Sequence, residues 1–179
     1  MNAEEKISKF LKEQKIVGKS KLSNIKISKD KNKNDQNLFY IRASILEKQV
    51  GINYSNSAIY YAFNQNGEYV GCVKVNVSNM NPPSQIEIEY WANEQFKNQG
   101  NMTILAKEVI KEIFVETTFD GLKVRDGFPT TNINSIVVSI NNDNYPSLAV
   151  ARKLGFDEQG CLEKSKYLSS QNISTGLKH

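Results

Sequence analysis

The run "INSIVVSI", residues 133–140, constrains the fold more than any other stretch because it is almost continuously apolar. A strand with one solvent-facing side alternates apolar and polar residues, whereas a continuous apolar run suits a strand that is covered on both faces. The segment "DNYPSLAVARKLGF" follows almost at once, and its periodicity predicts a helix over 147–154. A strand that leads directly into a helix in this way indicates an α/β arrangement.

Further helices and strands complete this picture. Helical spacing of apolar residues, β-rich runs around a turn, and alternation of apolar with acidic residues each predict an element. The additional predictions are a helix within 1–17, a hairpin over 58–77, a strand over 85–92, a helix over 102–114 and a strand over 161–168. We expect 28–37 to be a loop, 38–50 gives mixed signals, and 115–132 shows no clear element.

Composition excludes several chemistries and limits the chain to one substantial core. At 179 residues it suits a single domain. Its one histidine is His179, the last residue, which excludes a His-based triad and almost all zinc sites, so we expect no metal. Cys72 and Cys161 stand apart without a CxxC pair, as suits a reducing compartment.

The charge pattern allows an anionic partner without identifying one. The formal net charge is +4, and many lysines fall in 19–33. A solvated loop is the favoured interpretation of this run, and a nucleic-acid patch is the alternative. The charged N-terminus lacks the apolar core of a secretory signal, and no apolar stretch is long enough to cross a membrane. We therefore expect a cytoplasmic protein without membrane contact.

The loop before the helix at 102–114 has the makings of an anion site. Gly100 stands where a strand-to-helix turn would bring backbone close to a ligand. A helix start offers free N–H groups and the positive end of the helix dipole. The donors expected here are the N–H groups of Asn101, Met102, Thr103 and Ile104, with added charge from Lys97 and Lys107. A plain helix start after a glycine turn is the alternative interpretation.

Two motifs together resemble the GNAT superfamily of acyl-CoA-dependent N-acetyltransferases, in particular its RimJ/RimL branch. In that family a strand ending in Tyr-Trp leads into Q/R-x-x-G-x-G/A at a helix start, which here reads Lys97 to Met102. A later strand leads into Asn-x-x-Ser and a helix closing on "KLGF", which here are Asn144, Ser147 and 153–156. Lys97 replaces Gln or Arg, and Met102 replaces a small residue.

The resemblance implies a fold and a domain plan. The expected fold is α/β (α+β), with a mixed, mostly antiparallel sheet, splayed central parallel strands, and helices on both faces. Residues 1–179 are expected to form a single acyl-CoA N-acyltransferase-like domain. It divides into an unmatched N-terminal part, 1–57, and a family-like core, 58–165.

The resemblance also implies acetyl-CoA, or coenzyme A, as the co-substrate. Its pantetheine arm would fill the backbone groups exposed where the central strands part, since unpaired buried amides are costly. The implied binding residues are Tyr90, Trp91, Ala92, Lys97, Gln99, Gly100, Asn101, Met102, Thr103, Asn144, Ser147 and Lys153. For Asn144 and Ser147, a helix cap and a first-turn residue remain the alternative roles.

Acetyl transfer to an amine needs a base, an oxyanion donor and an acid. Glu87 and Glu89 share one face of the strand at 85–92, and Glu87 is the better candidate for the base. A backbone N–H near Tyr90 to Ala92 is expected to stabilise the oxyanion. By resemblance the acid is Ser147 or, second, Tyr145. Both glutamates remain open to the simpler interpretation of solvated strand carboxylates.

The leading hypothesis is therefore an acetyl-CoA-dependent N-acetyltransferase that works by direct attack in a ternary complex. The acceptor is a primary amine: a protein N-terminus, including one on a ribosomal protein, a small amine, or an aminoacyl group on RNA. The alternative is a non-catalytic acyl-CoA-binding or partner-binding module with the same fold. A nucleic-acid-binding protein, resting on charge alone, is the third class. A homodimer is an expectation from the resemblance.

Overall fold

A computed structural model describes residues 1–14, 22–46, 56–77, 85–115 and 133–171. The helices are α1 (Ala3–Glu13), α2 (Asn101–Phe114), α3 (Tyr145–Leu154) and α4 (Lys164–Ser170), with 3-10 turns η1 (Leu22–Asn24) and η2 (Glu94–Phe96). The strands are β1 (Lys26–Lys31), β2 (Asn37–Leu46), β3 (Asn56–Phe63), β4 (Tyr69–Val77), β5 (Gln85–Ala92), β6 (Ser135–Val138) and β7 (Cys161–Glu163).

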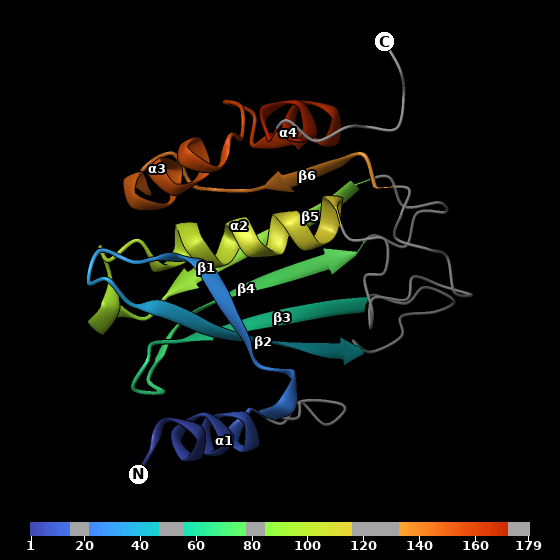
Figure 1. The fold of residues 1–179 in the computed structure, drawn as a ribbon. Coiled ribbons are helices and arrows are strands. Elements are labelled where there is room, and N and C mark those ends of the chain that lie inside the picture. Colours follow the sequence, from blue (N-terminus) through green and yellow to red (C-terminus); the bar gives the residue numbers. More distant parts are fainter. Residues whose placement is uncertain (15–21, 47–55, 78–84, 116–132, 172–179) are drawn as a thin grey trace.

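The strands form one seven-stranded sheet in chain order, β1 to β7 (Figure 1). Every neighbouring pair is antiparallel except β5 and β6, which run parallel. The parallel pair requires a crossover, and α2 lies within the chain segment that makes it. This is the mixed, mostly antiparallel sheet that the sequence motifs imply.

The two parallel strands, β5 and β6, diverge halfway along β5. Their register runs only from Gln85 opposite Ser135 to Ile88 opposite Val138. Beyond Ile88, β5 stays paired with β4 as far as Ala92, opposite Gly71. We call the opening between Glu89–Ala92 and the chain that follows Val138 the fork. The prediction of splayed central parallel strands is confirmed.

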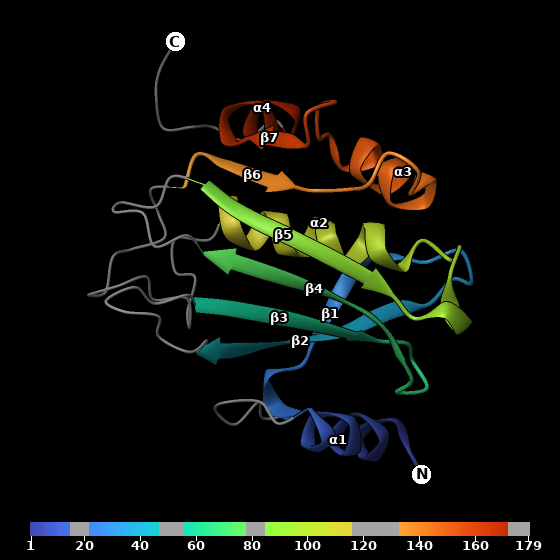
Figure 2. The same ribbon diagram turned by 180° about the vertical axis from the view of Figure 1, so that it is seen from behind.

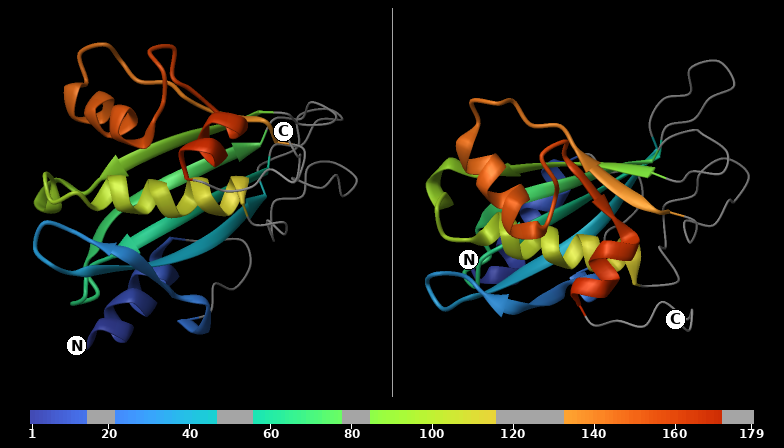
Figure 3. Two further views of the ribbon diagram at one scale, coloured as in Figure 1. Left: turned by 45° about the horizontal axis from the view of Figure 1, so that its top comes forward. Right: turned by 90° about the horizontal axis from the view of Figure 1, so that it is seen from above.

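The larger core lies between the sheet and α2, which crosses one sheet face (Figure 1). Alternate strand residues point towards this helix, among them Val73, Val75, Ile86 and Ile88. Helices α3 and α4 lie on the same side as α2 (Figure 3), and the Phe114 ring in α2 is 5.3 Å from that of Tyr167 in α4. One face of the sheet is thus covered by three helices.

A smaller core on the opposite face is formed by α1. Figure 2 shows this helix beside β2 and β3, away from α2. Its buried Ile7 and Leu11 pack with Ile41 and Tyr61, and Phe10 stacks on Tyr69 at 4.6 Å between ring centroids. Helices therefore lie on both faces of the sheet, as expected.

Several predicted elements are confirmed. These are the helix near the N-terminus, the hairpin around "NQNG", the strand at 85–92 and the helices at 102–114 and 147–154. Gly155 ends α3 with φ of 97°, and Phe156 folds back into the larger core. The mixed segment at 38–50 continues β2 to Leu46, and residues 47–50 lie outside the described residues, as does the connection at 116–132.

Three predictions were wrong in extent or type. The expected loop at 28–37 contains most of β1 and the start of β2. Its polar sequence hides a strand because β1 is an edge strand in which only Ser28 is buried. The strand expected at 133–140 is only Ser135–Val138, because β5 diverges from it. Only the face of this strand that points towards α2 is fully buried, through Ile136 and Val138. Its other face is half-buried.

The third difference concerns the final strand, which we expected over 161–168. It ends at Glu163, and the rest of the segment forms α4. The short β6 offers only three paired positions to β7. The chain then turns where the Lys164 N–H donates to the Asn134 carbonyl at 2.7 Å, and Leu168 becomes buried from a helix.

Candidate active site

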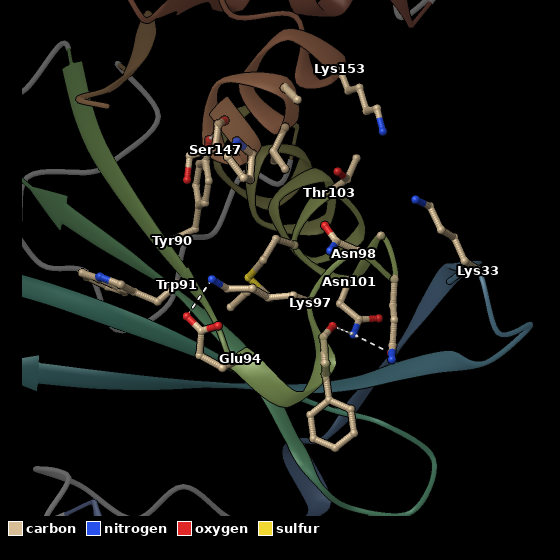
Figure 4. Close-up of a pocket in the computed structure, with 18 of the residues that line it drawn as sticks. Lys33, Tyr90, Trp91, Glu94, Lys97, Asn98, Asn101, Thr103, Ser147 and Lys153 are labelled. Carbon is tan, nitrogen blue, oxygen red and sulfur yellow. Dashed lines mark hydrogen bonds and ion pairs between the residues drawn. The ribbon is translucent and has the colours of Figure 1, made fainter. Parts of the chain in front are cut away.

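A cleft of about 460 Å³ opens where β5, the start of α2 and the start of α3 meet (Figure 4). Its volume lies within the range of about 300–1,000 Å³ that small-molecule sites occupy. The residues that line it are Lys33, Tyr90, Trp91, Ala92, Glu94, Phe96, Lys97, Asn98, Gln99, Gly100, Asn101, Met102, Thr103, Asn144, Pro146, Ser147, Ala149, Val150 and Lys153.

The start of α2 presents backbone donors to this cleft. Gly100 precedes the helix with φ 82° and ψ 6°, a left-handed conformation that glycine adopts without strain, and no side chain caps the helix. The first intrahelical bond runs from the Ile104 N–H to the Gly100 carbonyl at 3.2 Å. Ile104 is therefore not among the free donors that we expected. The N–H groups of Asn101, Met102 and Thr103 have no acceptor within the helix.

The loop before α2 is held by buried amides. Asn101, the first helical residue, is 3% exposed, and its Oδ1 accepts a hydrogen bond from Asn32 Nδ2 at 3.0 Å. Asn98 also has a positive φ, 63°, so the loop makes two left-handed turns between Lys97 and the helix. Because the loop is fixed by these contacts, its donors keep their direction without a ligand.

Met102 lines the cleft, but most of its side chain is buried in the larger core. It is 7% exposed and belongs to the buried cluster beneath α2. A Cβ placed on Gly71 of β4 would lie 2.2 Å from Met102 Cε, so the absence of a side chain at Gly71 is what makes room for the thioether. The bulky residue in place of a small one is thus accommodated below the helix start.

The start of α3 forms the opposite wall of the cleft, and a side chain of this segment caps the helix. Asn144 caps the helix, and its Oδ1 accepts from the Ser147 N–H at 3.4 Å. Pro146 occupies the first turn, where its missing N–H is no loss. The alternative roles of Asn144 as a cap and Ser147 as a first-turn residue are therefore present in the fold, and both residues also line the cleft.

Tyr90 bridges the fork on the α2 side. Its hydroxyl donates to the Ser147 carbonyl at 2.6 Å, which links β5 to the first turn of α3. Burial raises the pKa of Tyr90 to about 12, so the phenol stays protonated and keeps donating at neutral pH. The bond fixes how far the two walls of the cleft stand apart.

The charged groups in the cleft are three lysines and one glutamate. Lys97 Nζ lies 2.6 Å from Glu94 Oε1, and Figure 4 shows this pair near Trp91. Lys33 and Lys153 reach in from opposite sides of the opening (Figure 4). The cleft is therefore positive overall, which suits an anionic ligand.

Every residue that the resemblance implies for cofactor binding lines this cleft, although the residues come from β5, the loop before α2, and α3. Lys107, which we expected to add charge at the start of α2, does not line it, and its Nζ lies 3.8 Å from Asp30 Oδ2.

Among the proposed catalytic residues, only Ser147 lines the cleft. Tyr145 is 73% exposed and lines a neighbouring hollow with Ser139 and Arg152. The catalytic and binding roles stay predictions.

Glu87 and Glu89 lie on the other face of the sheet. Their neighbours Ile86 and Ile88 point towards α2, so strand alternation sends both carboxylates to the side where α1 lies. Glu89 Oε2 accepts a hydrogen bond from Asn76 Nδ2 on β4 at 3.2 Å. The proposed bases therefore lie on the sheet face opposite α2, and neither of them lines the cleft.

Sequence reasoning missed Lys33 as a cleft residue. We assigned it to a solvated lysine-rich run, but the turn between β1 and β2 brings it beside Gly100. No sequence signal revealed this, because β1 itself was not predicted. Among the described residues, no group of three or more His, Cys, Asp or Glu could hold a metal ion. None of the described helices has the length and apolar character of a membrane span.

Two solved acetyltransferase structures are similar to this chain. RimL, an α-N-protein acetyltransferase of a ribosomal protein solved with coenzyme A, is 24% identical over 56% of this chain and 48% of its own, with a TM-score of 0.42. A spermidine N-acetyltransferase from Vibrio cholerae is 13% identical over 64% of this chain and 68% of its own, with a TM-score of 0.50. The match thus spans about half of the RimL chain.

The sequence itself was compared with curated proteins and with family models. No curated protein matches it. The family model described as an acetyltransferase (GNAT) domain matches residues 12–157, starting upstream of the core at 58–165 that the motifs outline. The division of the chain at residue 57 stays a prediction. Because that match covers most of the chain, the protein belongs to the GNAT family of acetyltransferases.

Proposed function

We propose that the protein is an acetyl-CoA-dependent N-acetyltransferase that acetylates a primary amine by direct attack in a ternary complex. The observation that carries this proposal is the meeting of the fork and the uncapped start of α2 in one cleft. One feature offers unpaired strand backbone and the other offers an anion site. A ligand with both an amide-bearing arm and a diphosphate uses the two together.

The residues of the cleft fit coenzyme A. Asn101, Met102 and Thr103 line the cleft, and their N–H groups, which have no acceptor within the helix, suit the diphosphate. The edge of β5 from Glu89 to Ala92 has no β6 partner and suits the amides of the pantetheine arm. The cap uses Asn144 Oδ1, which leaves Nδ2 as a donor towards the same arm. The cofactor supplies the activated acetyl group as a thioester.

The acceptor amine must lose a proton before it attacks, since an ammonium has no lone pair and a lysine-type amine has a pKa of about 10. We assign this step to Glu87, with Glu89 second, acting through water. Both lie on the face opposite α2, so the acceptor approaches from that face and meets the acetyl group through the fork. This arrangement keeps the base away from the negatively charged phosphates.

Two other groups assist at the reacting carbonyl. A backbone N–H near Tyr90 to Ala92, on the edge of β5 that faces the fork, stabilises the oxyanion as it develops. Ser147 is the proposed proton donor to the departing thiolate because it lines the cleft, whereas Tyr145 does not. Tyr90 acts as a positioning residue, since its hydroxyl is committed to the Ser147 carbonyl.

The acceptor is a protein N-terminus, a small amine or an aminoacyl group on RNA. One similar structure is named for a ribosomal-protein acetyltransferase and another for a spermidine acetyltransferase, so the neighbours span two of these classes. The net charge of +4 suits an RNA-linked acceptor. A homodimer and a cytoplasmic location accompany this proposal.

A non-catalytic acyl-CoA-binding module is the second candidate. The observation that favours it is the composition of the cleft, where the lining carboxylate is Glu94 and it is paired with Lys97. In this reading the protein binds acyl-CoA and presents it, or itself, to a partner without turnover.

The test is calorimetric titration with acetyl-CoA, followed by thiol release with a panel of acceptors. The panel contains N-terminal peptides, diamines and polyamines, and an aminoacyl-RNA. Binding with thiol release on one acceptor supports the enzyme. Binding without release on any of them supports the module, and absence of binding contradicts both.

The base is tested by Glu87→Gln, with Glu89→Gln as the matched variant on the same strand face. Loss of a general base lowers the rate by about 100-fold or more, so we expect kcat to fall by that factor in Glu87→Gln. Acetyl-CoA affinity should stay unchanged in both variants because neither carboxylate lines the cleft. A fall in affinity equal to the fall in rate would contradict the assigned role.

A further inference from the structure

The lysines of the cleft differ in how far their charge is already neutralised. Lys97 is paired with Glu94 at 2.6 Å. Among the described residues, neither Lys33 nor Lys153 has an acidic group within 4.0 Å. Their ammonium groups are the charge that remains for a ligand, and they come from elements that lie far apart in the sequence.

Lys33 is held at the cleft because the turn between β1 and β2 is hydrogen-bonded to the loop before α2. Its backbone N–H donates to the Gln99 carbonyl at 2.9 Å, directly beside the start of α2. Asn32, which is 8% exposed, bonds Asn101 and also accepts from the N–H groups of Asn34 and Gln36 at 2.9 and 3.1 Å. Backbone and buried amide bonds therefore fix the turn, and the Lys33 side chain is left to face the opening.

The Lys33 stem also lies over the anion loop. A Cβ placed on Gly100 would lie 4.0 Å from Lys33 Cγ, so the Lys33 side chain passes close to the place that a side chain at this position would occupy. Lys153, from the last turn of α3, reaches towards the same opening from the other wall (Figure 4). The two lysines thus bring their charge to the same opening from two different elements.

The cleft thus has two separate anion-binding features, whereas a diphosphate needs only one. Coenzyme A carries a second, separate phosphate on the 3′ position of its ribose. Building on the proposed function, we propose that Lys33 and Lys153 bind this 3′-phosphate, and that the turn between β1 and β2 makes the protein selective for coenzyme A over dephospho-coenzyme A. Lysine suits this task as a compact charge that needs no fixed geometry.

The test is a cycle of two ligands and two proteins. Calorimetry measures the Kd of coenzyme A and of dephospho-coenzyme A for the wild type and for Lys33→Ala/Lys153→Ala. Two partly exposed charge-assisted contacts should make dephospho-coenzyme A bind about 5- to 20-fold more weakly to the wild type. In the double variant this ratio should fall to about 1, because coenzyme A loses affinity and the dephospho form does not.

Lys31→Ala is the matched control, since this lysine lies on the same hairpin, pairs with Asp35 and does not line the cleft. It should leave the ratio at the wild-type value, and raising the salt concentration should lower the ratio. Equal Kd values for both ligands in the wild type, or a ratio that persists in the double variant, would overturn this proposal alone. Failure of the wild type to bind either ligand would overturn the proposed function with it.

Discussion

The starts of α2 and α3 face the same cleft but are built in opposite ways. At α3, Asn144 caps the first turn through the Ser147 N–H, and the residues Tyr145 and Pro146 are exposed. At α2, no side chain caps the first turn, and the residues Asn101 and Met102 are 3% and 7% exposed. The start of α3 is exposed, and one of its N–H groups has a side-chain acceptor. The start of α2 has no side-chain acceptor, and its first two residues are buried.

This difference shows how a fold can leave donors open without losing the helix. A missing cap costs about 1 kcal/mol, because first-turn N–H groups lack acceptors. At α2, core packing of Met102 and the buried amides of Asn101 and Asn32 offset that cost. The backbone donors therefore stay available for a ligand, whereas α3 contributes side chains to the cleft.

The largest effect is expected from removing the buried Met102 side chain, which holds the start of α2 against the core. Met102→Ala removes a buried side chain and leaves a cavity above Gly71, so the free energy of unfolding should fall by about 2–4 kcal/mol. Pro146→Ala changes the corresponding second position of α3, which is exposed, and should cost less than about 1 kcal/mol. Chemical denaturation followed by circular dichroism measures both. Equal losses in the two variants would show that the two starts are anchored alike.

A smaller effect is expected when a negative side chain is placed beside the free N–H groups of α2. Thr103→Glu puts a carboxylate in the first turn, where it competes with the ligand's phosphates, so coenzyme A affinity should fall by about 10- to 100-fold. Stability should stay equal or rise by about 0.5 kcal/mol, because the acid favours the helix dipole.

Thr103→Val is the control for that change, since it keeps the side chain's shape and adds no charge. Its coenzyme A affinity should stay within about threefold of the wild type, because a half-buried hydroxyl contributes at most one hydrogen bond. Calorimetry and thermal unfolding give the two readouts. Unchanged affinity in Thr103→Glu would mean that no phosphate lies at the start of α2.

The smallest effects are expected at Asn144, where two substitutions distinguish its role as a helix cap from its proposed role as a donor to coenzyme A. Asn144→Ala removes the cap and should lower the free energy of unfolding by about 1 kcal/mol. Asn144→Asp keeps an oxygen for the Ser147 N–H but replaces the Nδ2 donor, so stability should be retained while coenzyme A affinity falls by about 3- to 10-fold. If Asp binds coenzyme A as tightly as Asn does, the residue serves α3 as a cap alone.

The cleft residues were predictable where local chemistry gives a signal. A glycine before an apolar helix, and an Asn-x-x-Ser ahead of "KLGF", mark two helix starts whatever the rest of the chain does. The loop at 97–100 and the start of α3 were therefore identified from short motifs. Their meeting in one cleft followed from the family resemblance and not from spacing.

The edge of the sheet was not predictable in the same way. β1 has a polar sequence with one buried residue, so it lacks the alternation that signals a strand. Its pairing with β2 is what turns Lys33 towards Gly100. Similarly, "CLEKSKYL" has a strand-like start, and only the short β6 beside it ends the strand at Glu163.

The sequence by itself determined the central elements and the two helix starts, because these depend on residue type and on contacts within a few residues. The tertiary structure alone decided where β5 and β6 part, which face carries Glu87 and Glu89, and that Lys33 reaches the cleft. Those outcomes depend on pairings between residues far apart in the chain, and a residue's own neighbours carry no information about such distant partners.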